Sequence, residues 1–360
     1  MATVLFTGFP GFLGSELLPR VLARDAGLHA RCLVQPKFAA LARRRAEELT
    51  ASNTGLAGRV EFVEGDITVH GLGLPAGALD EVVEIFHLAA LYDLSVPRHP
   101  AFRVNVDGTR NVLDAAAACP RLERLQYVST CYVSGRRAGS VTERDLAHAS
   151  GFHNHYEETK YEAERLVQER MRGGLPATIY RPSVVVGDST TGETQKYDGP
   201  YTVIRWLLKQ PWVAVMPVVG DTRAHTLNVV PRDFVVAAIA HLSAASASRG
   251  KVYQLADPSP PSIDRLLDLL ADATGRRVLR IPLPLTVAKT AIDRVPGVFR
   301  VMGIPSAAVD YFVHPARYDT AQAQADLAGS GITVPPLESY VRRLVDFVQA
   351  HPDLPAAAMA

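Results

Sequence analysis

The chain has 360 residues, of which 48% are hydrophobic and 21% charged, so it is long and apolar enough to bury a large core in one or two lobes. Its 38 basic and 37 acidic residues leave a net charge of +1, which provides no basic field for a nucleic-acid partner. Three cysteines without CxxC spacing argue against a disulfide framework or a thiolate zinc site, and they favour a reducing compartment.

The N-terminal stretch predicts a strand, a tight turn and the start of a helix. The apolar run Val4 to Phe6 is typical of a buried parallel strand, and a helix is expected to begin near Phe12. Between them lie Gly8, Gly11 and Gly14, with the spacing GxxGxxG. In a dinucleotide-binding unit such glycines permit the turn, let backbone amides approach the pyrophosphate, and let the helix pack on the strand. The anion then lies at the positive end of the helix dipole.

The end of the second predicted strand, Leu28 to Val34, bears on the choice of cofactor. An enzyme selective for NAD commonly places Asp or Glu there to bind the ribose hydroxyls, whereas cationic side chains suit the 2′-phosphate of NADP. Here Gln35 and Lys37 follow the strand, and residues 43–45 are three arginines on the next predicted helix. We therefore predict NADP, with Lys37 or Arg43 binding the phosphate. The arginine run is also typical of a solvated helix face.

More strands are predicted at Val60 to Val63, Ile85 to Ala90 and Leu125 to Thr130, with a helix at Asn105 to Ala118. This alternation of strands and helices predicts an α/β fold with a doubly wound parallel sheet. Residues that follow the strand ends are candidates to contact the cofactor. These candidates are Asp66, Ile67, Ala89 and Ala90.

A group of polar residues in the middle of the chain predicts acid–base chemistry. Ser129 and Thr130 end the fifth strand, where ligands of open parallel sheets bind, and Tyr156 and Lys160 follow on a predicted helix. The spacing of four puts the phenol and the ammonium on one face, one turn apart. A free tyrosine has a pKa of about 10, and a nearby ammonium together with a positive nicotinamide ring is expected to lower the pKa of Tyr156 to about 7.

With these motifs the chain resembles the extended short-chain dehydrogenase/reductases, and within them the thioester-reductase and fatty acyl-CoA reductase branch. The resemblance covers at least residues 1–240, and the segment from Asp188 to Tyr201 is the part that indicates the branch. The matching segments are Thr7 to Gly14, Gly65 to Thr68, His87 to Ala90, Asn105 to Thr109, Tyr127 to Thr130, Tyr156 to Lys160, Tyr180 to Gly187 and Gly192 to Tyr201.

The resemblance implies a Rossmann sheet and roles for individual residues. Thr130 is expected to bind the substrate carbonyl, Tyr156 to donate the proton, and Lys160 to be its electrostatic partner. Many NADP-using relatives have Arg directly after the second strand, where this chain has Gln35, so phosphate recognition is left to Lys37 or Arg43. The full expected cofactor set is Gly8, Phe9, Gly11, Phe12, Leu13, Gly14, Lys37, Arg43, Asp66, Ile67, Ala89, Ala90, Asn105, Tyr156, Lys160, Pro182 and Ser183.

The activity implied is NADPH-dependent reduction of an acyl thioester to an aldehyde or alcohol. The thioester would arrive on CoA or on a separate acyl carrier protein. A sugar-nucleotide epimerase or dehydratase, or a hydroxysteroid-type ketone dehydrogenase, would share the same catalytic trio and stays open as an alternative. A non-catalytic NADP sensor would tend to lose Tyr156 and Lys160, and both are present.

The C-terminal part is expected to form a smaller substrate lobe. We assign residues 1–180 mainly to the dinucleotide-binding domain with 227–256 returning to it, 181–226 and 257–335 to the lobe, and 336–360 to a C-terminal helix and tail. The apolar stretch from Ile281 to Val313 suits a lid over an acyl chain, a membrane-contacting patch, or packing within the lobe.

Two further classes of site are not expected. His148, His153 and His155 precede the catalytic tyrosine without an Asp, Glu or Cys partner at a ligand spacing, so we predict no metal. No apolar run of about 18 residues occurs, and the first 20 residues leave no room for a signal peptide. We therefore expect a cytoplasmic protein without stable membrane insertion.

Overall fold

The computed structural model describes residues 2–296 and 302–354. Seven strands form a central sheet in the order β3-β2-β1-β4-β5-β7-β11, and every neighbouring pair is parallel. Because the strand order reverses beside β1, the predicted doubly wound parallel sheet is confirmed. The strands of this sheet are β1 (Ala2–Thr7), β2 (Leu28–Val34), β3 (Val60–Glu64), β4 (Val82–His87), β5 (Arg124–Val128), β7 (Ala177–Pro182) and β11 (Val252–Leu255).

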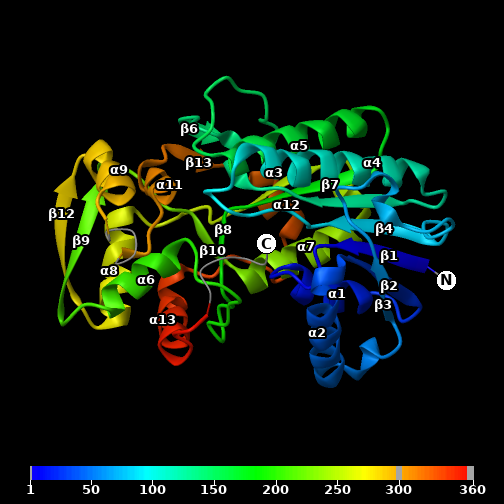
Figure 1. Cartoon of the computed structure of the whole chain (residues 1–360), viewed down its shortest axis with the longest axis horizontal. Coiled ribbons are helices and arrows are strands. Elements are labelled where there is room, and N and C mark those ends of the chain that lie inside the picture. The colour runs from blue at the N-terminus through cyan, green and yellow to red at the C-terminus, as the bar shows by residue number, and fades with distance from the viewer. Residues whose placement is uncertain (1, 297–301, 355–360) are drawn as a thin grey trace.

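Helices cover both faces of the sheet, as Figure 1 shows. Along β1, Phe6 packs into the cluster of one face and Leu5 into the cluster of the other, so this central strand is buried on both sides. The helices of one face are α1 (Gly14–Leu22), α2 (Ala39–Ser52) and α7 (Arg232–Ala244), and those of the other are α3 (Arg98–Phe102), α4 (Gly108–Ala118) and α5 (His155–Arg172).

The turn between β1 and α1 can be built only with glycine at its key positions. Gly8 has φ +95°, and a Cβ there would lie 2.7 Å from the backbone nitrogen of Ala89. A Cβ on Gly11 or on Gly14 would lie 2.6 Å from the carbonyl oxygen of Gly8. The glycines therefore shape the turn itself, and α1 begins at Gly14 rather than near Phe12.

Two other helices have clear local signals in the sequence. Helix α8 (Ile263–Thr274) has the Ser262 hydroxyl capping its first turn and Gly275 left-handed beyond its end. The helix expected before the fifth strand starts earlier, at Arg98, and contains one π-helical turn, η4 (Arg103–Asp107).

A second group of elements packs around its own hydrophobic cluster, beyond the carboxyl ends of the sheet strands (Figure 1). It contains parallel β9 and β12, and α13 contributes buried Leu344 and Val345. We call this group the lobe. Its elements are α6 (Pro200–Leu208), β9 (Val213–Val219), α8, β12 (Arg277–Leu283), α9 (Leu285–Arg294), α11 (Ser306–Val309), η7 (Asp310–Val313) and α13 (Val341–Ala350).

The lobe differs from the expected boundaries at the C-terminal end. The helix assigned to a separate C-terminal segment is α13, and it packs on α8 and α6. Residues 316–327, expected in the lobe, instead pack on the sheet side: β13 (Ala316–Tyr318) pairs with β6 (Gly139–Val141), and α12 (Ala321–Leu327) contacts α7 and β11. Positions 297–301 of the apolar stretch and 355–360 of the tail lie outside the described residues. The remaining strands, β8 (Val184–Val186) and β10 (Val229–Pro231), form a parallel pair.

Candidate active site

A cavity of about 710 Å³ runs from the glycine loop to the lobe. It lies at the carboxyl ends of β1, β4, β5 and β7, where open parallel sheets bind their ligands. Two residues that were predicted to contact the cofactor, Arg43 and Asn105, are not among the described residues that line this cavity. The predicted residues that do line it are Gly8, Phe9, Gly11, Phe12, Leu13, Gly14, Lys37, Asp66, Ile67, Ala89, Ala90, Thr130, Tyr156, Lys160, Pro182 and Ser183.

The start of α5 fixes the position of the predicted proton donor. The Asn154 side chain accepts from the backbone nitrogen of Glu157 at 3.0 Å and so caps the helix two residues before Tyr156. Tyr156 is buried and lines the cavity together with Thr130, whose hydroxyl acts to lower the pKa of the phenol. The structure therefore brings the predicted carbonyl-binding hydroxyl and the predicted proton donor together.

The two hydroxyls at the end of β5 face different surroundings. The Ser129 hydroxyl donates to the Glu164 carboxylate at 2.6 Å, and Glu164 forms a fully buried ion pair with Arg181 at 2.6 Å. Ser129 is thus committed to a structural network, and breaking such a buried pair by removing one partner is costly. Both residues line the cavity, but the Thr130 hydroxyl makes only longer bonds: it donates to the Pro182 carbonyl at 3.3 Å and accepts from the backbone nitrogen of Tyr132 at 3.3 Å. Of the two, Thr130 is the hydroxyl whose bond a substrate carbonyl could replace.

Lys160 is buried below Tyr156, and its ammonium is directed at the sheet. Its Nζ donates to the carbonyl oxygen of Val128 at 2.7 Å and to the hydroxyl of Tyr127 at 3.1 Å. Burial lowers the pKa of Lys160 to about 7. In the chain without a cofactor, burial raises the pKa of Tyr156, and the Thr130 hydroxyl opposes the rise only in part. Tyr156 is therefore protonated at neutral pH, the form that a proton donor requires. The expected lowering of this pKa depends on a bound, positively charged nicotinamide ring and stays a prediction.

The lining residues fit a bound dinucleotide. The glycine loop leaves no room for Cβ atoms and places the N-terminus of α1 at the cavity, which suits a pyrophosphate. The Ser183 hydroxyl lines the cavity, is buried, and has no hydrogen-bond partner within the described chain. Because an unsatisfied buried hydroxyl costs about 1–3 kcal/mol, a ligand that binds Ser183 would remove that cost.

Candidate phosphate-binding cations differ in their surroundings. Lys37 lines the cavity beyond β2, and its Nζ lies 4.8 Å from the ring centroid of Phe38. Arg45 instead pairs with Glu16 at 3.1 Å and with Glu48 at 3.0 Å, so it belongs to the surface of α2. The structure thus places Lys37 at the cavity and leaves the arginine run on the helix.

Asn105 braces the cavity wall instead of lining it. Its amide oxygen accepts from the backbone nitrogen of Leu91 at 2.7 Å, and its amide nitrogen donates to the Leu91 carbonyl at 3.1 Å and to the Thr159 hydroxyl at 3.0 Å. These bonds tie the loop after β4 to α5. Asn105 is therefore a positioning residue in this structure, which differs from the cofactor contact expected from the motif.

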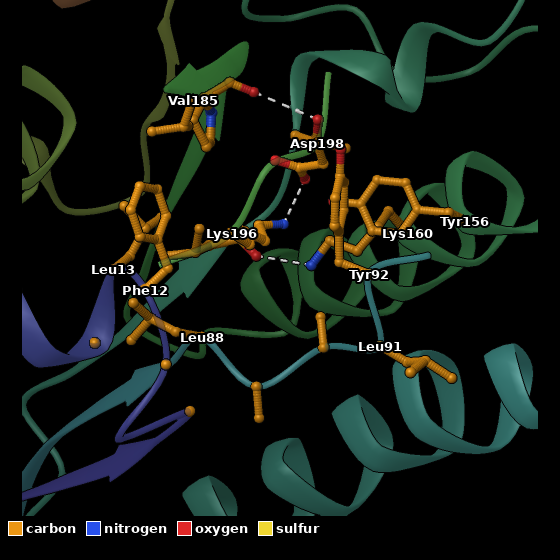
Figure 2. Close-up of a pocket in the computed structure, with 18 of the residues that line it drawn as sticks. Phe12, Leu13, Leu88, Leu91, Tyr92, Tyr156, Lys160, Val185, Lys196 and Asp198 are labelled. Atoms are coloured by element: carbon orange, nitrogen blue, oxygen red, sulfur yellow. Dashed lines mark hydrogen bonds and ion pairs between the residues drawn. The ribbon is translucent and has the colours of Figure 1, made fainter. Parts of the chain in front are cut away.

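The sequence motifs missed a polar cluster above Tyr156. Lys196 pairs with Asp198 at 2.5 Å, and its Nζ lies 3.9 Å from the ring centroid of Tyr92 (Figure 2). The Tyr92 ring in turn meets the Tyr156 ring edge to face, with centroids 4.8 Å apart. The sequence signal was a Lys-x-Asp pair in a segment noted only as a marker of the branch.

A second missed contribution comes from η7 of the lobe. Tyr311 and Phe312 line the cavity, together with Tyr132, which follows β5. The Asn154 amide donates to the Tyr311 hydroxyl at 3.0 Å, so the cap of α5 is bonded directly to the lobe. No local motif could have identified this contact, because its partners are 157 residues apart.

The three histidines before Tyr156 have protein partners. His148 Nε2 contacts the Val133 carbonyl at 2.9 Å, and His153 Nδ1 contacts the Glu157 carboxylate at 3.0 Å. His155 Nδ1 contacts Glu158 at 3.0 Å.

Across residues 2–296 and 302–354, no group of His, Cys, Asp and Glu side chains could hold a metal ion. In the same ranges every helix is too short or too polar to cross a membrane.

Comparison with known proteins gives a family and several relatives. The family model described as Male sterility protein matches residues 6–239. Glycine betaine reductase ATRR of Emericella nidulans is 33% identical over 276 residues, which is 72% of this chain and 21% of that protein. A linear gramicidin synthase of Brevibacillus parabrevis is 30% identical over 277 residues, which is 73% of this chain and 5% of that protein. The chain thus spans about a fifth of the first and a twentieth of the second.

A solved structure agrees over nearly the whole chain. The terminal R domain from the myxalamid PKS-NRPS biosynthetic pathway is 27% identical, with a TM-score of 0.82 that covers 99% of this chain and 92% of that one. The likeness therefore includes the lobe as well as the central sheet.

Proposed function

Because the chain belongs to the Male sterility protein family, within the extended short-chain dehydrogenase/reductases that its motifs predicted, we propose that it reduces acyl thioesters with NADPH. The chain is an oxidoreductase. The observation that carries the proposal is that Thr130, Tyr156 and Lys160 line one continuous cavity, between the glycine loop and the lobe.

The residues of the cavity divide the chemistry among them. A bound nicotinamide cofactor would supply the hydride, held by the glycine loop, with Ser183 beside it. The Thr130 hydroxyl donates a hydrogen bond to the carbonyl oxygen of the substrate, and Tyr156 protonates that oxygen as it gains negative charge. Lys160 supplies positive charge below the phenol when it is protonated, which favours proton release.

A thioester would be converted to the aldehyde in two stages. One hydride and one proton convert the carbonyl to a hemithioacetal, in which a new C–H and a new O–H bond replace the C=O π bond. Loss of the thiol breaks the C–S bond and gives the aldehyde, with the hydroxyl proton passing to the departing sulfur. A second hydride and proton at the same residues would give the alcohol.

We propose NADPH as the reductant and a carrier-bound thioester as the substrate. Lys37 at the cavity and the absence of an acid directly after β2 support a 2′-phosphate. The relative named as a linear gramicidin synthase and the myxalamid R domain support a thioester on a carrier protein, for which CoA is a simple substitute. A cytoplasmic location suits both the cofactor and the three buried free cysteines.

Oxidation of NADPH with product analysis tests this function. The panel is acyl-CoAs, the corresponding aldehydes, ketones and a nucleotide sugar, each with NADPH and with NADH. We expect NADPH oxidation with acyl-CoA, together with an aldehyde or alcohol product. Turnover of the ketone or the nucleotide sugar, with none on thioester or aldehyde, would overturn the proposal in favour of another enzyme of the same superfamily.

A further inference from the structure

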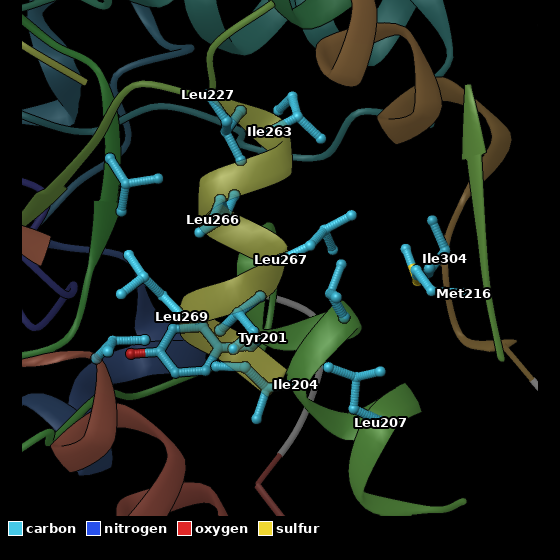
Figure 3. Packing of buried hydrophobic residues seen from close by; sticks show 14 of the residues in the cluster. Tyr201, Ile204, Leu207, Met216, Leu227, Ile263, Leu266, Leu267, Leu269 and Ile304 are labelled. Atoms are coloured by element: carbon cyan, nitrogen blue, oxygen red, sulfur yellow. The ribbon is translucent and has the colours of Figure 1, made fainter. Parts of the chain in front are cut away.

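A second cavity, of about 50 Å³, lies inside the lobe. Its walls come from β9, α8 and α9, and they include Met216, Ile263, Leu267 and Ile292. Figure 3 shows Met216 and Ile304 across from the α8 side chains that face this space. Every described residue that lines it is apolar, so it offers water no hydrogen-bond partner from a side chain. An alkyl group is the ligand that such a space suits.

One residue is shared by the linings of this small cavity and the catalytic one. Phe312 of η7 lines both. Its neighbours divide in the same way, because Ala308 lines the catalytic cavity and Val309 lines the small one. The turn that contains these residues is therefore the partition, and the Phe312 ring is the part that both spaces share.

The partition is anchored by the two residues that precede Phe312. The Lys289 ammonium of α9 pairs with the Asp310 carboxylate at 2.7 Å. The Tyr311 hydroxyl accepts from Asn154 at 3.0 Å. Both bonds hold backbone neighbours, whereas Phe312 itself is held by packing against the lobe cluster. Shortening the Phe312 side chain should therefore connect the two cavities while the turn keeps its position.

We propose that Phe312 sets the length of the acyl chain that the enzyme accepts, and that the small cavity is a closed continuation of the acyl site. The part of this inference that concerns acyl groups rests on the proposed function. An unbranched saturated chain would lie along the catalytic cavity with its methyl end against the Phe312 ring. Each methylene buried before that point should raise affinity about fourfold, and methylenes beyond it should add nothing. With the ring removed, the small cavity holds about three to five more water-sized groups.

Binding of primary fatty alcohols tests the site without requiring turnover. The full-length protein saturated with NADP⁺ is titrated by calorimetry with unbranched alcohols from butanol to tetradecanol. The affinity of the wild type should rise with chain length up to a definite number of carbons and stay constant beyond it. We call this limiting chain length the stop. Phe312→Ala should move that stop by a few carbons, and the milder Phe312→Leu by fewer. An unchanged stop in both folded variants overturns the proposal.

Two further variants separate the partition from general loosening of the lobe. Phe347→Ala makes the same change at a ring that packs on the lobe cluster and stacks on His351, away from both cavities, so the stop should not move. Ala288→Leu fills the small cavity, and added to Phe312→Ala it should return the stop to the wild-type carbon. The role of Phe312 is contradicted if Phe347→Ala moves the stop as far as Phe312→Ala does. It is also contradicted if the stop of the Phe312→Ala, Ala288→Leu double variant stays where Phe312→Ala put it.

The same variants with acyl-CoAs of matching lengths show whether the site serves catalysis. We expect the length preference in kcat/KM to move with the alcohol stop. If no acyl-CoA is reduced while Phe312→Ala still moves the alcohol stop, the proposed function fails and the alkyl site stands. If acyl-CoAs are reduced with the same length preference in the wild type and Phe312→Ala, the proposed function stands and the role of Phe312 fails.

Discussion

The two ends of the catalytic cavity are built in different ways. The end proposed to bind the cofactor consists mainly of turns that directly follow β1, β2, β3 and β4, within the first 90 residues, with Ser183 after β7 beside them. The substrate end consists of side chains from segments far apart in the sequence, including Tyr92, Tyr132, Lys196 and Phe312. We therefore expect backbone turns to bind the cofactor, which enzymes of one fold share, and packed side chains to bind the substrate, which differs between such enzymes.

This difference separates two kinds of experimental effect. Changes at the cofactor end should alter cofactor binding and leave substrate preference intact. Changes at the lobe should alter substrate handling and leave cofactor affinity intact. Tyr156 and Thr130 lie where the two ends meet, so they should affect the chemical step alone.

The largest effect is expected at the junction. Tyr156→Phe removes the proton donor and keeps the ring, so kcat should fall about 10²- to 10⁴-fold while cofactor affinity stays close to wild type. Steady-state kinetics and fluorescence titration with NADPH measure the two quantities. Tyr92→Phe is the matched control, since its ring contacts Tyr156 but is given no proton-transfer role. Near-normal turnover in Tyr156→Phe would contradict the mechanism.

A cofactor-end change should come next in size. Lys37→Glu should weaken NADPH binding about 10- to 100-fold, because it removes a charge-assisted hydrogen bond and adds repulsion against the 2′-phosphate. NADH, which lacks that phosphate, should bind almost as before. Arg43→Glu makes the same change on α2, outside the described cavity lining, and should have little effect. Equal losses for NADPH and NADH would mean that Lys37 does not bind the phosphate.

Lys160 predicts a pH dependence in the cofactor-free protein. Its pKa is about 7 when folded, against 10.5 in the reference state, so between these values the unfolded chain holds more protons. Stability from this group therefore rises with pH across that window, by at most about 1.4 kcal/mol per pH unit. Urea unfolding of wild type and Lys160→Met should show their difference in unfolding free energy changing in favour of wild type from pH 7 to 10. A difference that stays constant would contradict the buried, depressed lysine.

The smallest effect is expected where the lobe meets α5. Tyr311→Phe removes the hydroxyl that accepts from Asn154 and should cost about 0.5–1.5 kcal/mol of stability, with a modest rise in KM for the thioester and unchanged cofactor affinity. Tyr340→Phe is the matched control, because that buried hydroxyl has no hydrogen-bond partner among the described residues. If both variants lose the same stability, the bond between the cap and η7 contributes nothing.

The same contrast explains what could be predicted from the sequence. The sheet was predictable because its central strands β1 and β5, buried on both faces, contain short apolar runs, and because the turn after β1 needs glycine for steric reasons. The positions of Thr130 and Tyr156 followed from a strand end and a helix motif. Local patterns of this kind are complete within a few residues of the sequence.

The remaining features depend on packing between distant segments. The direction of the Lys160 ammonium is set by the Val128 carbonyl and Tyr127 hydroxyl, and the spacing of four from Tyr156 predicted only a shared helix face. The indirect role of Asn105 follows from its bonds to Leu91. The lobe wall at Phe312 exists only after the chain has folded, so no residue near Phe312 in the sequence indicates the cavity that it limits.

Transfer of deuterium from reduced, deuterated NADP decides whether this cavity performs the proposed reaction. The enzyme is mixed with the deuterated cofactor and an acyl-CoA, and the products are identified by mass spectrometry. We predict deuterium on the former carbonyl carbon of the aldehyde or alcohol, with one free CoA released for each thioester reduced, and a loss of this product in Tyr156→Phe. Unlabelled free acid and CoA, or the same labelled yield from Tyr156→Phe, would contradict the account.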